Sequence, residues 1–196
     1  MQRVSAGALR GRKLMTLPDG VAGLRPMASR IREAVFDRLG PDVRDARVLD
    51  VFAGSGALAI EALSRGASFA TLFELDARVV RHLRSQLATL SLGERSEVHS
   101  GDAVGLLGAG PRRGAPYDLV FVDPPFASPH IFTPVLDALC SRGWLAPGAR
   151  IVCERERIRG SAAPGHASGN YVCPESLDLE ATRIYGQAQV EFLALR

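Results

Sequence analysis

Residues 47–66, which read RVLDVFAGSGALAIEALSRG, constrain the fold more than any other stretch of the chain. An apolar run over residues 48–52 leads into the tight turn Ala53-Gly54-Ser55-Gly56, and the segment after the turn carries leucine, isoleucine and alanine at helical spacing. Strand, glycine turn and helix are the parts from which α/β folds build a crevice for a nucleotide-like ligand. The stretch therefore predicts an α/β domain with a ligand site at this turn.

The turn favours a cationic ligand that carries no phosphate. From Gly54 the chain reads G-S-G-A-L-A, which meets only the looser form of the dinucleotide fingerprint, with alanine in the last place. Asp50, at the end of the strand, would repel a pyrophosphate. S-adenosylmethionine (AdoMet) fits these limits, because it has a sulfonium, an ammonium and a ribose but no phosphate.

Acidic residues also end the next two predicted strands. The run at residues 69–73 leads into Glu74, eighteen residues after Gly56, which is near the spacing at which an acid meets ribose hydroxyls. The run at 97–100 leads into Asp102, which could accept a hydrogen bond from an adenine amine. Any one such acid is more often a helix cap or a solvated charge, so the prediction depends on their succession. The predicted AdoMet-binding residues are Asp50, Phe52, Gly54, Ser55, Gly56, Glu74, Asp102 and Ala103.

A second motif, Asp123-Pro124-Pro125-Phe126, follows the apolar run at residues 119–122. Two prolines stop a strand and stiffen the turn after it. The Asp123 carboxylate and the Pro124 carbonyl could both accept from one NH2 group, and Phe126 offers a face for stacking, worth about 1–3 kcal/mol per base. Taken alone, the motif is explained equally well by an ordinary strand end that enters a loop. Together with the glycine turn, it favours a site that presents a planar amine to an electrophile.

The order of these motifs is similar to that of Rossmann-like methyltransferases, and D-P-P-F resembles the [N/D]-P-P-[F/Y/W] motif of enzymes that methylate planar amino groups. A closer resemblance, to the bacterial RsmD family, extends over nearly the whole chain. It is carried by residues 7–14, 24–39, 48–67, 121–126 and 183–193. The chain departs from many relatives after its Arg-Pro pair, where Met27, Ala28 and Ser29 stand in place of Thr, Thr or Ser, and Asp.

Alternating strands and helices followed by two terminal strand-like runs predict a mostly parallel sheet with an antiparallel edge. The resemblance implies a class I methyltransferase with seven strands, a C-terminal hairpin and a small N-terminal β-hairpin. It also implies the reaction, which is transfer of a methyl group from AdoMet to the N2 amine of a guanine in small-subunit (16S) ribosomal RNA. Asp123 and Pro124 would then orient the amine and Phe126 would stack on the base.

Three other functions stay open at this point. The same four residues could present the N6 amine of adenine in DNA or RNA. A methyltransferase of a protein glutamine side chain is a further possibility, although Asn would be expected at position 123. The chain could also be a non-catalytic RNA-binding or assembly factor that keeps the fold, which the intact cofactor turn argues against.

Basic residues gather near the start of the chain. The net charge is +3 overall, but residues 1–40 hold eight basic side chains against three acidic ones. Such a cluster is either a solvated segment or a nucleic-acid footprint, and the base-handling motif favours the second. The predicted RNA contacts are Arg10, Arg12, Lys13, Arg25 and Arg30.

We expect a basic arm or hairpin over residues 1–23, able to reach beyond a methyltransferase domain at 24–196. Ser29 is a candidate N-cap for a helix to Leu39 whose arginines, Arg30, Arg32 and Arg38, point away from its apolar face. Residues 143–148 read as a turn into a strand at 150–154.

With 196 residues and 46% hydrophobic content, the chain suits one α/β domain. It has neither an apolar run of the length that spans a membrane nor a signal-peptide segment, so we expect a cytoplasmic protein without a membrane partner. The three cysteines lack ligand spacing, which favours reduced thiols and no metal. A monomer acting on the ribosomal RNA, within a small subunit or an assembly intermediate, is expected.

Overall fold

The computed structural model describes residues 2–17, 27–111, 113–157 and 171–196. The strands are β1 (Arg47–Asp50), β2 (Phe69–Glu74), β3 (Ser96–Ser100), β4 (Tyr117–Val122), β5 (Leu145–Glu156), β6 (Leu177–Tyr185) and β7 (Ala188–Leu195). The α-helices are α1 (Ser29–Leu39), α2 (Ala57–Ser64), α3 (Ala77–Thr89), α4 (Ala103–Gly108) and α5 (Phe132–Ser141). Three short 3-10 helices, at Gly40–Val43, Gly93–Arg95 and Pro129–Ile131, connect them.

The strands form one seven-stranded sheet in the order β3-β2-β1-β4-β5-β7-β6. Strands β1 to β5 are parallel, whereas β7 runs antiparallel to both β5 and β6. This arrangement confirms the predicted sheet and its C-terminal hairpin. The strand order reverses between β1 and β4, and a parallel α/β sheet binds ligands at the carboxyl ends of the strands beside such a switch point.

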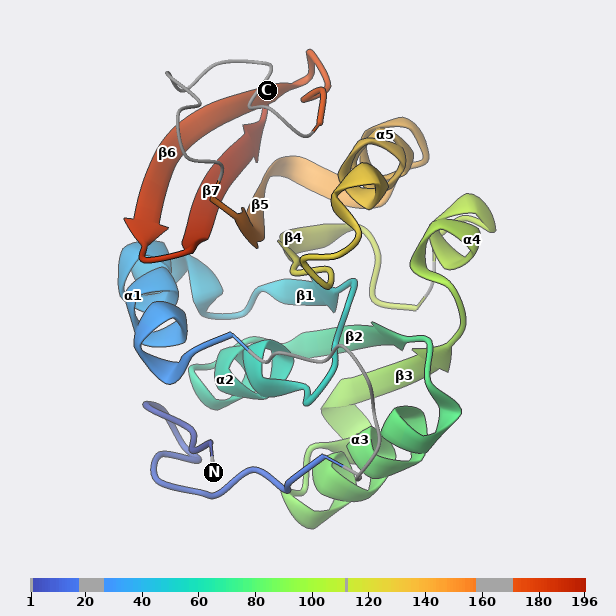
Figure 1. Cartoon of the computed structure of the whole chain (residues 1–196). Coiled ribbons are helices and arrows are strands. Elements are labelled where there is room, and N and C mark those ends of the chain that lie inside the picture. Colours follow the sequence, from blue (N-terminus) through green and yellow to red (C-terminus); the bar gives the residue numbers. More distant parts are fainter. Residues whose placement is uncertain (1, 18–26, 112, 158–170) are drawn as a thin grey trace.

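Helices cover both faces of the sheet (Figure 1). Helices α1, α2 and α3 pack on one face, where Val48 and Phe121 belong to the same hydrophobic cluster. Helices α4 and α5 pack on the other face, with Leu49 and Val120. Because neighbouring residues of a strand point to opposite faces, strands buried on both sides read as continuous apolar runs.

Residues 2–15, here called the N-terminal hairpin, form the predicted small β-hairpin. Arg3 and Lys13 make an antiparallel bridge, and the Val4 N–H donates to the Arg12 carbonyl at 3.0 Å. Val4 and Leu14 are only 2% and 3% exposed, because they pack into the cluster on the α1–α3 face. The hairpin therefore lies against the body of the protein, next to α2 and α3 (Figure 1), instead of reaching beyond it.

Helix α1 corrects two of the predictions. Ala28, not Ser29, is its N-cap residue, and no side chain caps the helix. Arg32 was expected to face outward, but it is fully buried, and its Nε lies 3.5 Å from a carboxylate oxygen of Glu61 on α2. An ion pair between elements far apart in the sequence leaves no trace in the periodicity of one helix, so the pattern assigned Arg32 to the wrong side.

The predicted turn at 143–148 is wrong in its second half, since β5 already begins at Leu145. Its pairing with β4 jumps from Tyr117–Leu145 to Leu119–Arg150, so β5 carries three more residues than β4 over this interval and forms an irregularity. Pro147 and Gly148 lie in this irregular part, where a proline is tolerated.

No helix within the described ranges has the length and apolar character needed to cross a membrane. Cys140, Cys153 and Cys173 are free thiols. In the same ranges no group of three or more His, Cys, Asp or Glu side chains could hold a metal ion. The expected absence of a metal stays a prediction.

Candidate active site

A cavity of about 680 Å³ opens at the carboxyl ends of β1, β2 and β4, beside the point where the strand order reverses. Its volume is in the usual range for a small-molecule site. The glycine turn forms one wall and the Asp-Pro-Pro-Phe motif another. Of the predicted site residues, those that line the cavity are Phe52, Gly54, Ser55, Glu74, Asp102, Ala103, Asp123, Pro124 and Phe126.

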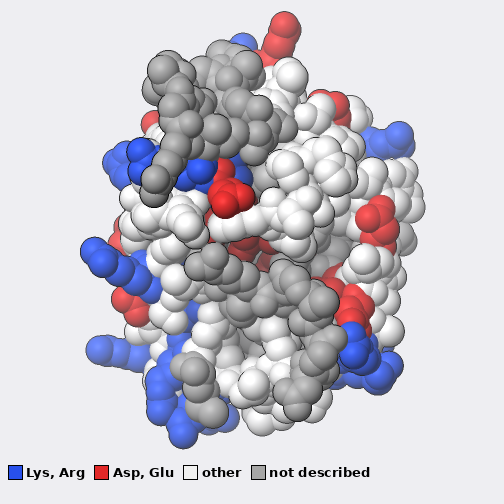
Figure 2. All heavy atoms as spheres, in the orientation of Figure 1, with Lys and Arg blue, Asp and Glu red and all other residues white. Residues whose placement is uncertain are grey.

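The lining of the cavity is acidic. Its described residues include four carboxyl side chains, those of Glu74, Asp76, Asp102 and Asp123, and none of these described residues is Lys, Arg or His. Figure 2 shows acidic atoms in the recess at the centre of this face, while most basic atoms lie along its outer margins. Among the described residues, Asp76 alone of these four acids forms a salt bridge, with 2.6 Å between its Oδ2 and Nη2 of Arg78. The cavity therefore suits a cationic ligand and disfavours a phosphate.

Glu74 fixes the glycine turn. One carboxylate oxygen accepts from the Gly54 N–H at 3.0 Å, and the other accepts from the Asp76 N–H at 2.8 Å. Gly54 has a φ of +50°, which favours glycine. An ionised carboxylate has about four acceptor positions, so Glu74 can still receive hydrogen bonds from a ligand.

Asp50 and Gly56 lie behind the turn and do not line the cavity. A Cβ on Gly56 would stand 2.7 Å from a methyl carbon of Leu83, so this glycine permits close packing of the turn on α3. Asp50 is 1% exposed, and neither of its oxygens makes a hydrogen bond of ordinary geometry with a described residue. Burial raises the pKa of Asp50 to about 7, against the opposing effect of the Ala59 and Phe52 backbone N–H groups.

Asp102 both caps a helix and faces the cavity. Its Oδ2 accepts from the Gly105 N–H at 2.8 Å as the N-cap of α4. The side chain is exposed and lines the cavity, so its remaining acceptor positions stay available to a ligand. The helix-cap interpretation and the ligand interpretation of this residue therefore do not exclude each other.

The Asp-Pro-Pro-Phe motif begins where β4 ends, and a hydrogen bond of 2.9 Å from the Ser128 N–H to the Pro125 carbonyl closes its turn. Asp123 is half-buried, and its pKa is raised well above the usual range by burial and then by the charges of Glu154 and Asp50. The Pro124 carbonyl receives no backbone hydrogen bond from the described residues. Phe126 is half-buried against the hydrophobic core and also lines the cavity. Two acceptors and an aromatic ring therefore lie together, as the motif predicts.

Several apolar residues of the cavity were missed by sequence reasoning. They are Met27, Leu58, Leu75 and Ile131. Leu75 is 69% exposed, an unusual state for leucine, and it follows Glu74 directly. An apolar residue after a strand-end acid is a signal that could have been used. Met27 reaches the cavity from just before the N-cap of α1, and Ile131 from the 3-10 helix before α5, and no local pattern reveals either contact.

The predicted RNA contacts lie outside the cavity. Arg10, Arg12 and Lys13 are exposed on the N-terminal hairpin, and Arg30 is exposed on the first turn of α1. Arg25 falls outside the described residues. The structure thus leaves four of the five predicted side chains accessible to a partner.

The fold and the crevice at its switch point are those of a class I methyltransferase. The family model described as "Conserved hypothetical protein 95" matches residues 2–193. Ribosomal RNA small subunit methyltransferase D of Escherichia coli K12 is 46% identical over 158 residues, which are 81% of this chain and 76% of that protein. Its namesake from Haemophilus influenzae is 39% identical over 83% of this chain and 82% of its own length. The chain belongs to the RsmD family.

Solved structures agree with this assignment. The Escherichia coli protein yhhF has 38% sequence identity and a TM-score of 0.82, covering 100% of this chain and 98% of its own. An RNA methyltransferase from Salinibacter ruber, solved with S-adenosyl-L-homocysteine, is 14% identical with a TM-score of 0.60 and covers 87% of this chain and 94% of its own. At that identity the similarity shows the shared fold alone.

Proposed function

We propose that this protein transfers the methyl group of AdoMet to the exocyclic N2 amine of a guanine in 16S ribosomal RNA, as a monomer acting on the small subunit or an assembly intermediate. One observation carries the proposal. The glycine turn and the Asp-Pro-Pro-Phe motif, 67 positions apart from Gly56 to Asp123, line the same acidic cavity. The names of the relatives from Escherichia coli and Haemophilus influenzae support ribosomal RNA of the small subunit as the substrate.

The cavity fits AdoMet in volume and in charge. Gly54 and Ser55 would hold the methionine part, and Glu74 would accept from the ribose hydroxyls while it keeps the turn in place. Asp102 and Ala103 would meet the adenine, with Leu75 against its apolar surface. Asp50 would act from behind the turn, since its buried carboxyl adds to the negative potential that a cation relieves.

When bound, AdoMet supplies an electrophilic methyl group on a sulfonium. The carboxylate of Asp123 and the carbonyl of Pro124 would accept hydrogen bonds from the two hydrogens of the amine, which turns the nitrogen lone pair toward that methyl group. Phe126 would stack on the guanine, and this contact offsets part of the few kcal/mol needed to take the base out of its helix. Most of the rate enhancement would then come from alignment and from these polar acceptors.

The charge state of Asp123 matters for this role, because only the ionised carboxylate is purely an acceptor. Its raised pKa in the free protein results from burial and from two neighbouring acids. A cationic cofactor beside these acids would favour their ionised forms. Binding of AdoMet would therefore prepare Asp123 to receive the amine.

The Asp123→Ala variant tests the proposal. It should still bind AdoMet in calorimetry, because Asp123 has no assigned contact with the cofactor and contributes to its binding only through charge. Methyl transfer should fall by about 100-fold or more, since loss of one preorganised polar contact to the reacting group typically costs that much. Asp123→Asn, which keeps an acceptor oxygen in place, should recover part of the rate. Wild-type turnover by the alanine variant would sink the assignment.

A further inference from the structure

Ser55 of the glycine turn is held from two sides. Its hydroxyl donates to Oε1 of Gln2 at 3.3 Å, and its carbonyl accepts from Nε2 of Gln86 on α3 at 2.8 Å. Ser55 lines the cavity and is 8% exposed. The position of this part of the cofactor turn thus depends on two glutamine side chains.

Both glutamines connect Ser55 to the N-terminal hairpin. Gln2 belongs to the hairpin, and its Nε2 also donates to the carbonyl of Met27, another residue of the cavity wall, at 3.1 Å. Gln86 is 1% exposed, and its Oε1 accepts from the Met15 N–H at the other end of the hairpin at 2.5 Å. Each amide therefore uses both its donor and its acceptor to bridge the hairpin and the cavity.

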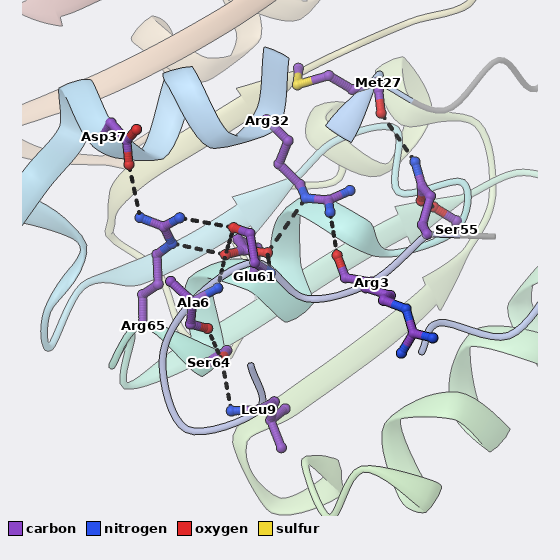
Figure 3. A network of polar contacts seen from close by, with 12 residues as sticks. Arg3, Ala6, Leu9, Met27, Arg32, Asp37, Ser55, Glu61, Ser64 and Arg65 are labelled. Carbon is purple, nitrogen blue, oxygen red and sulfur yellow. Dashed lines mark hydrogen bonds and ion pairs between the residues drawn. The ribbon is translucent and has the colours of Figure 1, made fainter. Parts of the chain in front are cut away.

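The hairpin itself is fixed on the body of the protein by a second set of polar contacts (Figure 3). Glu61 on α2 accepts from the Ser5 N–H at 2.9 Å, from the Ser5 hydroxyl at 2.6 Å and from the Ala6 N–H at 3.1 Å. Arg32 pairs with Glu61 and donates from Nη2 to the Arg3 carbonyl at 2.6 Å. Because Glu61 and Arg32 each make more than one of these contacts, a movement of the hairpin would also move the side chains bonded to it.

The outer surface of the same hairpin is basic. Arg10, Arg12 and Lys13 are exposed there, whereas Val4 and Leu14 point into the core. One short segment therefore combines the side chains suited to a phosphate backbone with the contacts that hold the cofactor turn. A ligand that binds this outer surface and restrains the hairpin would therefore also restrain the positions of Ser55 and Met27.

We propose that Gln2 and Gln86 are positioning residues that couple RNA contact at the N-terminal hairpin to AdoMet binding at Ser55 and Met27, an inference that rests on the function proposed above. RNA bound to the basic surface further restrains the docked hairpin, and the two amides then hold the cavity wall in the geometry that receives the cofactor. Cofactor binding strengthens RNA binding by the same factor, as linkage requires. The enzyme would thereby bind its two substrates cooperatively.

Equilibrium dialysis with labelled S-adenosyl-L-homocysteine, which cannot donate a methyl group, measures this coupling directly. Affinity is determined with and without small ribosomal subunits that lack the modification. Subunits should tighten binding to the wild-type protein by about fivefold or more, the lower end of typical couplings. Gln2→Glu and Gln86→Glu keep the acceptor oxygens but replace each donating NH2 with an oxygen that faces a carbonyl. Both should reduce the effect of subunits to less than about twofold.

Gln187→Glu is the matched control, because Gln187 is exposed in the turn between β6 and β7, and it should behave as wild type. Thermal unfolding of each variant shows whether a loss of coupling reflects a loss of the fold. If the variant at the buried Gln86 is unstable, Gln2→Glu, at a half-buried position, tests the proposal alone. Unchanged coupling in Gln2→Glu, or no effect of subunits on the wild-type protein, would overturn the proposal. Failure of the wild-type protein to bind the cofactor product or to methylate subunits would instead overturn the proposed function.

Discussion

Asp50 and Asp123 are acidic residues kept in a setting that disfavours their charge. Burial is the main cause for both; the charges of Glu154 and Asp50 further raise the pKa of Asp123, and the charge of Glu74 further raises the pKa of Asp50. Buried carboxyls without matching cations cost stability, and such groups cluster at functional sites. Here the destabilisation from these two carboxyls is consistent with a site that binds a cationic ligand.

Asp50→Asn tests this at the level of stability. The pKa of Asp50 rises from 3.8 to about 7 on folding, so between these values the folded protein binds more protons than the unfolded chain. The free energy of unfolding should therefore fall as the pH rises through this window. Asparagine cannot ionise, so in the variant the free energy of unfolding should decrease less over this pH range, by on the order of a few kcal/mol. Urea unfolding at pH 4.5 and at pH 8 measures the difference.

The matched control is Asp37→Asn, since that side chain is 75% exposed. It should keep the pH dependence of the wild-type protein. If the free energy of unfolding changed with pH equally in Asp50→Asn and in the wild-type protein, ionisation of Asp50 would not destabilise the folded state, and the account would be contradicted.

At the scale of residues, the sequence could predict the acids and the glycines but not their polar partners. Glu74 ends β2, Asp102 lies two residues after the end of β3, and Asp123 directly follows β4. The ends of such strands can be predicted from hydrophobic patterns. Gln2 and Gln86 gave no signal, because their roles depend on contacts with Ser55 across 53 and 31 positions. The same applies to Arg32, whose partner Glu61 determines that it is buried.

At the scale of elements, the N-terminal hairpin differs most from expectation, because it is docked by close contact. Gly7 has a φ of +79°, and a Cβ there would lie 1.8 Å from the Ser64 carbonyl oxygen of α2. Neighbouring groups add to this docking, with the Ala8 N–H donating to that same oxygen at 2.8 Å and the Ser64 hydroxyl donating to the Ala6 carbonyl at 2.6 Å. A side chain at position 7 therefore cannot be accommodated without moving the hairpin.

Gly7→Ala should lower the free energy of unfolding by roughly 2–4 kcal/mol, because the added Cβ overpacks against Ser64 and alanine is strained at a positive φ. Gly11→Ala is a close comparison, because Gly11 has a φ of +81° but nothing within 4 Å of an added Cβ. Its cost should be limited to about 1–2 kcal/mol for the left-handed conformation. Urea denaturation of both variants gives the comparison, and similar losses would show that contact with Ser64 does not hold the hairpin.

The central strands were the most predictable elements, since β1, β2 and β4 are largely apolar runs that end at or just before an acidic residue. The start of β5 was not, because Pro147 and Gly148 read as a turn while the strand continues around them as an irregularity. Helix α1 was predicted in its extent but not in its capping, because Ala28 begins the helix without a side-chain hydrogen bond. Local patterns thus predict where an element runs better than how it begins.

At the scale of the whole molecule, charge is separated between an acidic cavity and basic margins (Figure 2). This division suits a protein that binds a cationic cofactor inside and a polyanion outside. It could be predicted in part from the excess of basic residues in positions 1–40, although burial of Arg32 removes one of them from the surface.

Replacing Arg10, Arg12 and Lys13 together with alanine should weaken binding of 16S ribosomal RNA and leave AdoMet binding in the absence of RNA unchanged. Each lost phosphate contact should reduce the slope of log affinity against log salt concentration by roughly 0.7 to 0.9. A triple alanine variant at the exposed residues Arg44, Arg142 and Arg183 controls for net charge and should keep the slope. Filter binding over a series of salt concentrations measures both, and equal slopes for the two variants would exclude the hairpin as an RNA contact.

The measurement that tests the central claim most directly is transfer of a labelled methyl group from AdoMet to small ribosomal subunits that lack the modification, followed by nucleoside analysis of the product. Free ribosomal RNA and DNA are treated in parallel. The Asp-Pro-Pro-Phe cavity and the family together predict label in N2-methylguanosine, from subunits or from free ribosomal RNA. Label in N6-methyladenine, or no label although AdoMet binds tightly, would contradict the account.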